Sequence, residues 1–148
     1  MSGTGPDLSL LDRLLGDVLF ECEIARTSRA AVYKVRTGSA ERPLALKVAL
    51  ERSDAEDLAR FRHEVRLLSE ARHPNVVEVH DFGVLPGDFA FLTMELLAGN
   101  GLPERIRQAG WESFYDAAIQ AAAGLAHIHR QGVIHMDIKP RNLALAEA

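Results

Sequence analysis

Residues 135–142 read His-Met-Asp-Ile-Lys-Pro-Arg-Asn, and the rest of the chain is best interpreted outward from them. Asp137, Lys139 and Asn142 bring a potential base, a cation and a metal-coordinating amide into one loop that Pro140 stiffens. An ordinary turn uses Asp, Pro and Asn for its geometry, but it needs neither the histidine nor the lysine. The stretch therefore predicts a loop with catalytic chemistry, held between two brief strands.

The sequence before this loop has a helical pattern. Residues 101–110 predict a short helix, and a longer one follows it. Gly132 is a natural stop for the longer helix. The apolar positions of this helix recur at spacings of four and three: Phe114, Ala118, Ala121, Leu125 and Ile128.

The first part of the chain is rich in strand-forming residues. Runs at residues 18–25, 30–37 and 43–50 predict an antiparallel three-strand meander. Two further strands, over residues 76–84 and 89–97, are predicted on either side of the turn Leu85-Pro86-Gly87-Asp88.

A helix over about residues 54–71 is predicted between the third and fourth strands. Ser53 and Glu56 have the spacing of a capping box, and His73-Pro74-Asn75 ends the helical pattern. One face of this helix is apolar, because hydrophobic residues recur at spacings of three and four: Leu58, Phe61, Val65 and Leu68.

Two charged residues lie where these elements predict partly buried positions. Lys47 shares its face of the third strand with Ala45 and Ala49, and Glu64 lies at the border of the apolar face of the helix. An unpaired buried carboxylate costs several kcal/mol, whereas a lysine from a neighbouring strand compensates it. The two are predicted to form an ion pair. The alternatives are a solvated helical glutamate and a lysine that reaches water from a strand edge.

The composition excludes several other functions. The chain has 148 residues, with 17 Lys and Arg against 21 Asp and Glu, and no basic block that would neutralise a nucleic acid. Its single cysteine, Cys22, forms neither an internal disulfide nor a thiolate metal site. No apolar run approaches the roughly 18 residues needed to cross a membrane. A cytoplasmic protein with no nucleic acid or membrane partner is expected.

Together these features resemble the eukaryotic-type Ser/Thr protein kinase domain. Residues 135–142 are similar to the family's catalytic loop, His-Arg-Asp-x-Lys-Pro-x-Asn, and Leu-Ala-Leu-Lys at 44–47 is similar to its strand motif Val-Ala-Ile-Lys. Glu64 falls where the family's helical glutamate pairs with that lysine. His73-Pro74-Asn75-Val76-Val77 and the segment from Met94 to Leu102 resemble the lead into the fourth strand and the gatekeeper and hinge.

The resemblance covers about residues 17–148 and implies an α+β, protein kinase-like fold. A five-stranded antiparallel N-lobe with one helix is expected over residues 17–97. The first helices and the catalytic loop of an incomplete C-lobe are expected over residues 98–148. Residues 1–16 are expected to form a flexible tail or a short docking helix.

The resemblance also implies an activity and its cofactors. ATP and magnesium would serve the transfer of the γ-phosphate of ATP to serine or threonine hydroxyls of a protein substrate. Lys47, held by Glu64, would contact the α- and β-phosphates of ATP. The adenine pocket is implied at Val32, Ala45, the gatekeeper Met94 and the backbone from Glu95 to Leu97.

The catalytic loop receives its roles from the same resemblance. Asp137 would accept or orient the proton of the substrate hydroxyl, Lys139 would stabilise the transferring phosphoryl group, and Asn142 would hold a magnesium ion. A lysine two residues after the catalytic aspartate favours serine or threonine over tyrosine as acceptor.

The chain departs from the family pattern in its phosphate-binding loop. The family has Gly-x-Gly-x-x-Gly-x-Val, whereas residues 25–32 read Ala-Arg-Thr-Ser-Arg-Ala-Ala-Val and lack all three glycines. Glycine lets backbone amides approach phosphates closely, so weaker binding of ATP is expected. Arg26 and Arg29 are candidates to offset this loss by their charge. Met136 replaces the arginine before the catalytic aspartate, so control by a phosphorylated activation loop is not expected.

The sequence ends six residues after Asn142, before any metal-binding Asp-Phe-Gly. Asp81-Phe82-Gly83 spells the same letters, but it precedes the catalytic loop and has no such role. Very weak catalysis by this chain alone is expected. The chain is interpreted either as a truncated piece of a longer protein or as a piece that a partner chain completes by covering the C-lobe. The alternatives are a pseudokinase-like module that binds a nucleotide or a partner without turnover, and a small-molecule phosphotransferase, which usually has a histidine where Lys139 stands.

Overall fold

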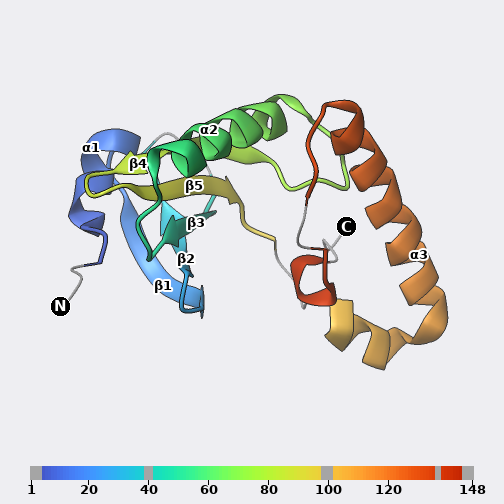
Figure 1. Cartoon of the computed structure of the whole chain (residues 1–148). Coiled ribbons are helices and arrows are strands. Elements are labelled where there is room, and N and C mark those ends of the chain that lie inside the picture. The colour runs from blue at the N-terminus through green and yellow to red at the C-terminus, as the bar shows by residue number, and fades with distance from the viewer. Residues whose placement is uncertain (1–4, 39–41, 98–101, 136–137, 145–148) are drawn as a thin grey trace. The chain divides into compact units, whose positions relative to one another are not determined.

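The structure, a computed structural model of the chain, describes residues 5–38, 42–97, 102–135 and 138–144; the side chains of residues 102–110 and 141 lie outside that description. The chain divides into two compact units (Figure 1). The first comprises the residues up to Ser69 together with Glu78–Leu96, and the second comprises Glu70–Val77 and the residues from Leu97 onward. The division after Leu96 lies next to the lobe boundary expected after Leu97, whereas Glu70–Val77 group with the second unit.

The first unit is built on a five-stranded antiparallel sheet with the strand order β1-β2-β3-β5-β4 (Figure 1). The five predicted strands and the three-strand meander are confirmed. The strands are β1 Leu19–Arg26, β2 Ala30–Arg36, β3 Leu44–Ala49, β4 Val79–Leu85 and β5 Phe89–Glu95.

The predicted turn between β4 and β5 is also confirmed. The Asp88 amide donates to the Leu85 carbonyl at 3.1 Å. Pro86 occupies the second position of the turn, and Gly87 occupies the third with a φ of +89°. This is the residue pattern of a type II turn, in which glycine tolerates a positive φ that side chains disfavour.

One face of the sheet carries the main hydrophobic core. The N-terminal segment packs there as a 3₁₀ helix, Leu8–Leu10, followed by α1, Leu11–Leu15, and Leu11 is fully buried. Over its described residues, the segment expected as a flexible tail or a short docking helix is therefore helical and contributes to the core. The other buried members of this core are Val35, Leu44, Leu46, Val48, Leu85, Phe89 and Phe91.

The helix between β3 and β4 is α2, Ala55–Glu70, close to the predicted range. Its predicted apolar face is confirmed, because Leu58 and Val65 are buried. The ring of Phe61 meets that of Phe82 in β4 edge to face, with the ring centroids 6.5 Å apart. The apolar face of α2 therefore packs beside β4.

The predicted capping box of Ser53 and Glu56 at the amino terminus of α2 is wrong. The Asp57 amide donates to Oδ1 of Asp54 at 2.8 Å, so Asp54 caps the helix. The helix begins at Ala55, one residue later than a cap at Ser53 requires.

Replacing Asp54 by alanine is expected to lower the free energy of unfolding by about 1 kcal/mol, because an amide of the first turn loses its acceptor. Ser53→Ala, one residue earlier, is expected to change it by less than about 0.5 kcal/mol. Urea unfolding of the two variants measures the difference. A larger loss in Ser53→Ala would restore the predicted capping box.

The main element of the second unit is α3, Leu102–Arg130. The prediction of a short helix over residues 101–110 and a separate longer one is wrong, because α3 is continuous through both. Gly110 lies inside α3. An isolated glycine costs a helix only about 1 kcal/mol relative to alanine, which is too little to end a long helix.

The predicted stop at Gly132 is confirmed. Gly132 has a φ of +82°, its amide donates to the His129 carbonyl at 3.0 Å, and the Val133 amide donates to the Ile128 carbonyl at 3.0 Å. These two bonds form a Schellman motif, and the side chains at the two positions that such a motif usually brings together, Ile128 and Val133, are both buried.

The segment that joins α2 to β4 packs against α3 within the second unit. The Asn75 side-chain amide donates to Oε1 of Gln120 at 3.1 Å, and the rings of His73 and His127 lie 4.9 Å apart. A Cβ added at Gly124 would lie 2.7 Å from the Asn75 carbonyl oxygen. Glycine at position 124 therefore permits a close approach of two backbones.

The segment after α3 contains a 3₁₀ helix, Pro140–Asn142. The two brief strands predicted around this loop are not formed; among its described residues only Ala144 makes an isolated β-bridge. Pro140 has no amide to donate to a strand partner, and the apolar runs on either side are short.

Candidate functional site

The strand register gathers four of the predicted nucleotide-binding residues on one face of the sheet. Val32 of β2 is opposite Lys47 of β3, and Ala45 of β3 is opposite Met94 of β5. Cross-strand partners share a face, and residues two apart on a strand do as well. Val32, Ala45, Lys47 and Met94 therefore lie on the face opposite the core, which we call the Lys47 face.

The four predicted binding residues on the Lys47 face combine small or apolar side chains with one cation, Lys47. Lys34 and Arg36 lie farther along β2 on the same face, and both pair with Glu21. Lys47 is exposed, Ala45 is buried, and Val32 and Met94 are half-buried. The arrangement offers apolar surface for a flat ring and an ammonium group for an anion.

Lys47 and Glu64 do not form the predicted ion pair in this structure. The ion pairs among the described residues have a nitrogen–oxygen distance of 4.0 Å or less, and none of them joins Lys47 to Glu64. Lys47 is exposed and Glu64 is half-buried. Because both groups retain water, burial does not force them to pair. Both residues belong to the first unit.

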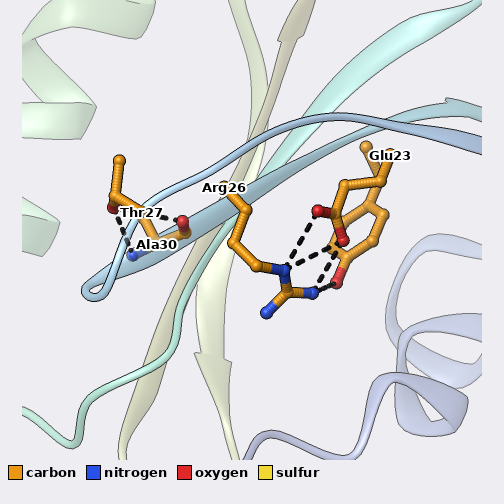
Figure 2. Close-up of polar contacts among 5 residues, drawn as sticks. Glu23, Arg26, Thr27 and Ala30 are labelled. Carbon is orange, nitrogen blue, oxygen red and sulfur yellow. Dashed lines mark hydrogen bonds and ion pairs between the residues drawn. The ribbon is translucent and has the colours of Figure 1, made fainter.

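The hairpin between β1 and β2 occupies the place of the family's phosphate-binding loop. Its tip, residues 27–30, is closed by bonds from Thr27 (Figure 2). The Thr27 amide donates to the Ala30 carbonyl at 2.8 Å. The Thr27 hydroxyl oxygen accepts from the amides of Arg29 at 3.3 Å and Ala30 at 3.1 Å. Three of the four amides of the tip are therefore bonded within it.

Arg26, a candidate to replace the lost glycines by charge, is held away from the Lys47 face. Arg26 is the cross-strand partner of Ala31. Ala31 and Tyr33 are two residues apart on β2, so both lie on the face opposite Val32. Nη2 of Arg26 donates to Oε2 of Glu23 at 2.7 Å and to the Tyr33 hydroxyl at 2.9 Å (Figure 2). The arginine lowers the pKa of Glu23 below its usual range, mainly through their hydrogen bond, and the same bond raises the pKa of Arg26.

Arg29, the second candidate, lies at the exposed tip. Its Nε is 3.8 Å from Oε2 of Glu51, and both side chains are largely exposed. Such a pair is weak in water, so Arg29 remains able to move.

The predicted hinge follows β5. The Glu95 amide donates to the Glu78 carbonyl at 2.9 Å, and Oε1 of Glu95 accepts from the Glu78 amide at 2.9 Å. Glu95 therefore already uses its amide and its carboxylate to hold β4 and β5 together. Leu97 is half-buried and lies two residues beyond the end of β5.

The second unit contributes the described part of the predicted catalytic loop. Lys139 has an extended backbone and precedes the 3₁₀ helix, and the Asn142 amide donates to the Lys139 carbonyl at 2.9 Å. This bond fixes the spacing of Lys139 and Asn142 along the backbone. Asp137 and Met136 lie outside the described residues.

Sequence reasoning missed the residues that close the hairpin. Thr27 replaces the second glycine of the family pattern, and Glu23 and Tyr33 immobilise Arg26. A threonine within a four-residue turn is itself a signal, because its hydroxyl can accept from backbone amides two or three residues later, as that of Thr27 does.

The described part of the chain has neither a cluster of metal-ligating side chains nor a membrane-spanning helix. No group of three or more His, Cys, Asp or Glu side chains there is placed to hold a metal ion. No helix there has the length and apolar character to cross a membrane. The role of Asn142 at magnesium stays a prediction.

The chain is similar to proteins of known activity. The family described as protein kinase domain matches residues 21–148. Serine/threonine-protein kinase PknK of Mycobacterium tuberculosis is 34% identical over 129 residues, which make up 84% of this chain and 12% of PknK. Calcium/calmodulin-dependent protein kinase type IV of Homo sapiens is 32% identical over 129 residues, which make up 85% of this chain and 26% of that protein. The chain thus spans well under half the length of these relatives.

The fold is also similar to solved structures. The crystal structure of the M. tuberculosis PknI kinase domain superposes with a TM-score of 0.77 at 23% identity, covering 87% of this chain and 54% of that chain. The predicted α+β kinase-like fold is confirmed by this likeness.

Proposed function

Because this chain belongs to the protein kinase domain family, we propose that it carries part of an ATP-dependent protein serine/threonine kinase. Such an enzyme transfers the γ-phosphate of ATP to serine or threonine hydroxyls of a protein substrate. The observation that supports this proposal is the strand register, which gathers Val32, Ala45, Lys47 and Met94 on one face.

The Lys47 face fits an adenine nucleotide by its chemistry. Val32 and Ala45 offer apolar contact to a base, and Met94 is proposed as the gatekeeper. The exposed ammonium of Lys47 is available to an α- or β-phosphate. Since the Glu95 amide is already bonded, recognition of the adenine edge falls to the remaining backbone groups from Glu95 to Leu97.

The catalytic loop is proposed to act on the acceptor and on the phosphoryl group. ATP supplies the phosphoryl group, and magnesium neutralises its charge. Asp137 orients the substrate hydroxyl and accepts its proton, and Lys139 stabilises charge on the phosphoryl oxygens. Asn142 would hold magnesium through its side-chain oxygen, a ligand type that this ion prefers.

Replacing Lys47 by methionine is expected to weaken ATP binding about tenfold, because one charge-assisted contact to phosphate is lost. Arg62→Met removes one positive charge from an exposed position of α2 and is expected to leave the affinity unchanged. Calorimetric titration with ATP and magnesium measures both. Equal affinities for wild type and Lys47→Met would remove Lys47 from the proposed site.

A second candidate function is nucleotide or partner binding without turnover. The missing Lys47–Glu64 ion pair and the closed hairpin tip favour it. Transfer of labelled γ-phosphate to a Ser/Thr peptide separates the two functions, with Asp137→Asn as the inactive control. Transfer above that control supports the kinase, whereas binding without transfer supports the second function.

The acceptor class and the surroundings belong to the same proposal. Lys139 favours protein hydroxyls over the small-molecule acceptors of related phosphotransferases, and an aminoglycoside offered in the same assay tests this choice.

A cytoplasmic protein without a nucleic acid or membrane partner remains the expectation from composition. The predicted partner chain has a candidate contact in the exposed side chains of α3: Trp111, Tyr115 and Ile119.

A further inference from the structure

The hairpin tip at residues 27–30 carries an inference that rests on the proposed nucleotide binding. We infer that Thr27 holds this tip closed and withholds the amides of Arg29 and Ala30 from phosphate, so that Lys47 is the main phosphate contact of the first unit. Thr27 thereby determines how strongly the site distinguishes ATP from a nucleoside without phosphates.

The first argument is the hydrogen bonding of the tip. The amides of Arg29 and Ala30 both donate to the Thr27 hydroxyl oxygen, and that hydroxyl donates to the Ala30 carbonyl at 3.3 Å. A phosphate must displace the hydroxyl before it reaches either amide. Each amide must give up its hydrogen bond to the Thr27 hydroxyl to form one with phosphate. The free energy of phosphate binding is therefore less favourable than it would be for an amide without a hydrogen bond.

The second argument is the attachment of the tip to the segment after β3. The Arg29 carbonyl accepts from the Leu50 amide at 2.8 Å, and Arg29 also lies near Glu51. Turning the tip toward a ligand therefore requires breaking a second backbone bond. Glu51 lies 3.8 Å from Arg29 and offsets part of the charge with which Arg29 would attract a phosphate.

The third argument is the position of Arg26. Its guanidinium bonds to Glu23 and Tyr33 on the face opposite the Lys47 face (Figure 2). Its charge is largely neutralised there by the Glu23 carboxylate. Arg26 therefore does not replace the amides that the tip withholds.

The expected selectivity follows from these contacts. The base and ribose contacts are the same for adenosine and ATP, so the ratio of their affinities isolates the phosphate contacts. In Thr27→Gly, the hydroxyl is lost and the backbone gains freedom at a position where the family has glycine. The preference for ATP over adenosine is expected to rise at least about fivefold in this variant.

The experiment is a calorimetric titration of the 148-residue chain with adenosine and with ATP and magnesium. Wild type, Thr27→Gly and Thr27→Ser are compared, and Thr27→Ser keeps the hydroxyl and is expected to keep the wild-type ratio. Arg26→Ala is expected to keep it too. Amide hydrogen exchange at Arg29 and Ala30 provides a separate readout, with faster exchange expected only in Thr27→Gly.

The outcomes distinguish this inference from the proposed function. If Thr27→Gly frees both amides and leaves the ratio unchanged or lower, the inference is overturned while nucleotide binding stands. A fall of the ratio in Arg26→Ala overturns it as well. If neither adenosine nor ATP binds any of the variants, nucleotide binding itself fails.

Discussion

Replacing Leu11 by alanine will lower the free energy of unfolding of the chain by about 2–5 kcal/mol, the range measured for buried leucines. Leu11 is 0% exposed and belongs to the same core as Leu46 and Phe91. Hydrogen bonds between the surrounding strands restrict their movement, so these strands fill only part of the cavity that the side chain leaves. The N-terminal segment is therefore expected to behave as part of the fold.

Leu14→Ala is the matched control, because Leu14 lies on the same short helix and is 55% exposed. Its loss is expected to change the free energy of unfolding by less than about 0.5 kcal/mol. Urea unfolding followed by circular dichroism compares the two variants. Equal effects would mean that this segment does not contribute to the core in solution.

The sheet was predictable because strand patterns are local. In β3, Leu44, Leu46 and Val48 alternate with Ala45 and Lys47, and this alternation assigns each residue to a face without any knowledge of the neighbouring strands. The core position of Leu11 was not predictable in the same way. α1 has only five residues, too few for a helical period to show which leucine faces inward.

The candidate site was predictable only in part. The grouping of Ala45 with Lys47 follows from their spacing on one strand. The position of Glu64 on α2 also follows from spacing, but a helical period does not determine the rotation of α2 about its axis relative to the sheet, and the ion pair depends on that rotation. The bonds that hold Arg26 and Thr27 join polar side chains at a hairpin tip, where no hydrophobic pattern reports on geometry.

Replacing Gly124 by alanine is the other change with a large expected effect. The added Cβ would lie 2.7 Å from the Asn75 carbonyl oxygen and 3.3 Å from the Asn75 Cβ. The close neighbour is backbone, which has no rotamer by which to move away. The segment from Glu70 to Val77 must shift from α3 to admit the methyl group, and this shift also strains the bond from Asn75 to Gln120.

Two opposing effects decide the sign of this change. Alanine is favoured over glycine inside a helix by about 1 kcal/mol, which would stabilise the variant. Overpacking against fixed neighbours costs about 1–3 kcal/mol and sometimes more. A net loss of stability of up to about 2 kcal/mol is therefore expected, in the direction opposite to helix propensity.

Ala126→Gly calibrates the propensity effect on the same helix, because Ala126 is exposed and two residues away. That variant is expected to lose about 1 kcal/mol from propensity alone. If both Gly124→Ala and Ala126→Gly are destabilised, the contact with Asn75 outweighs propensity at position 124. If Gly124→Ala is instead stabilised by as much as Ala126→Gly is destabilised, the segment around Asn75 does not approach α3 closely in solution. Another contact would then hold this segment to α3, and the tilted rings of His73 and His127, with centroids 4.9 Å apart, are the candidate.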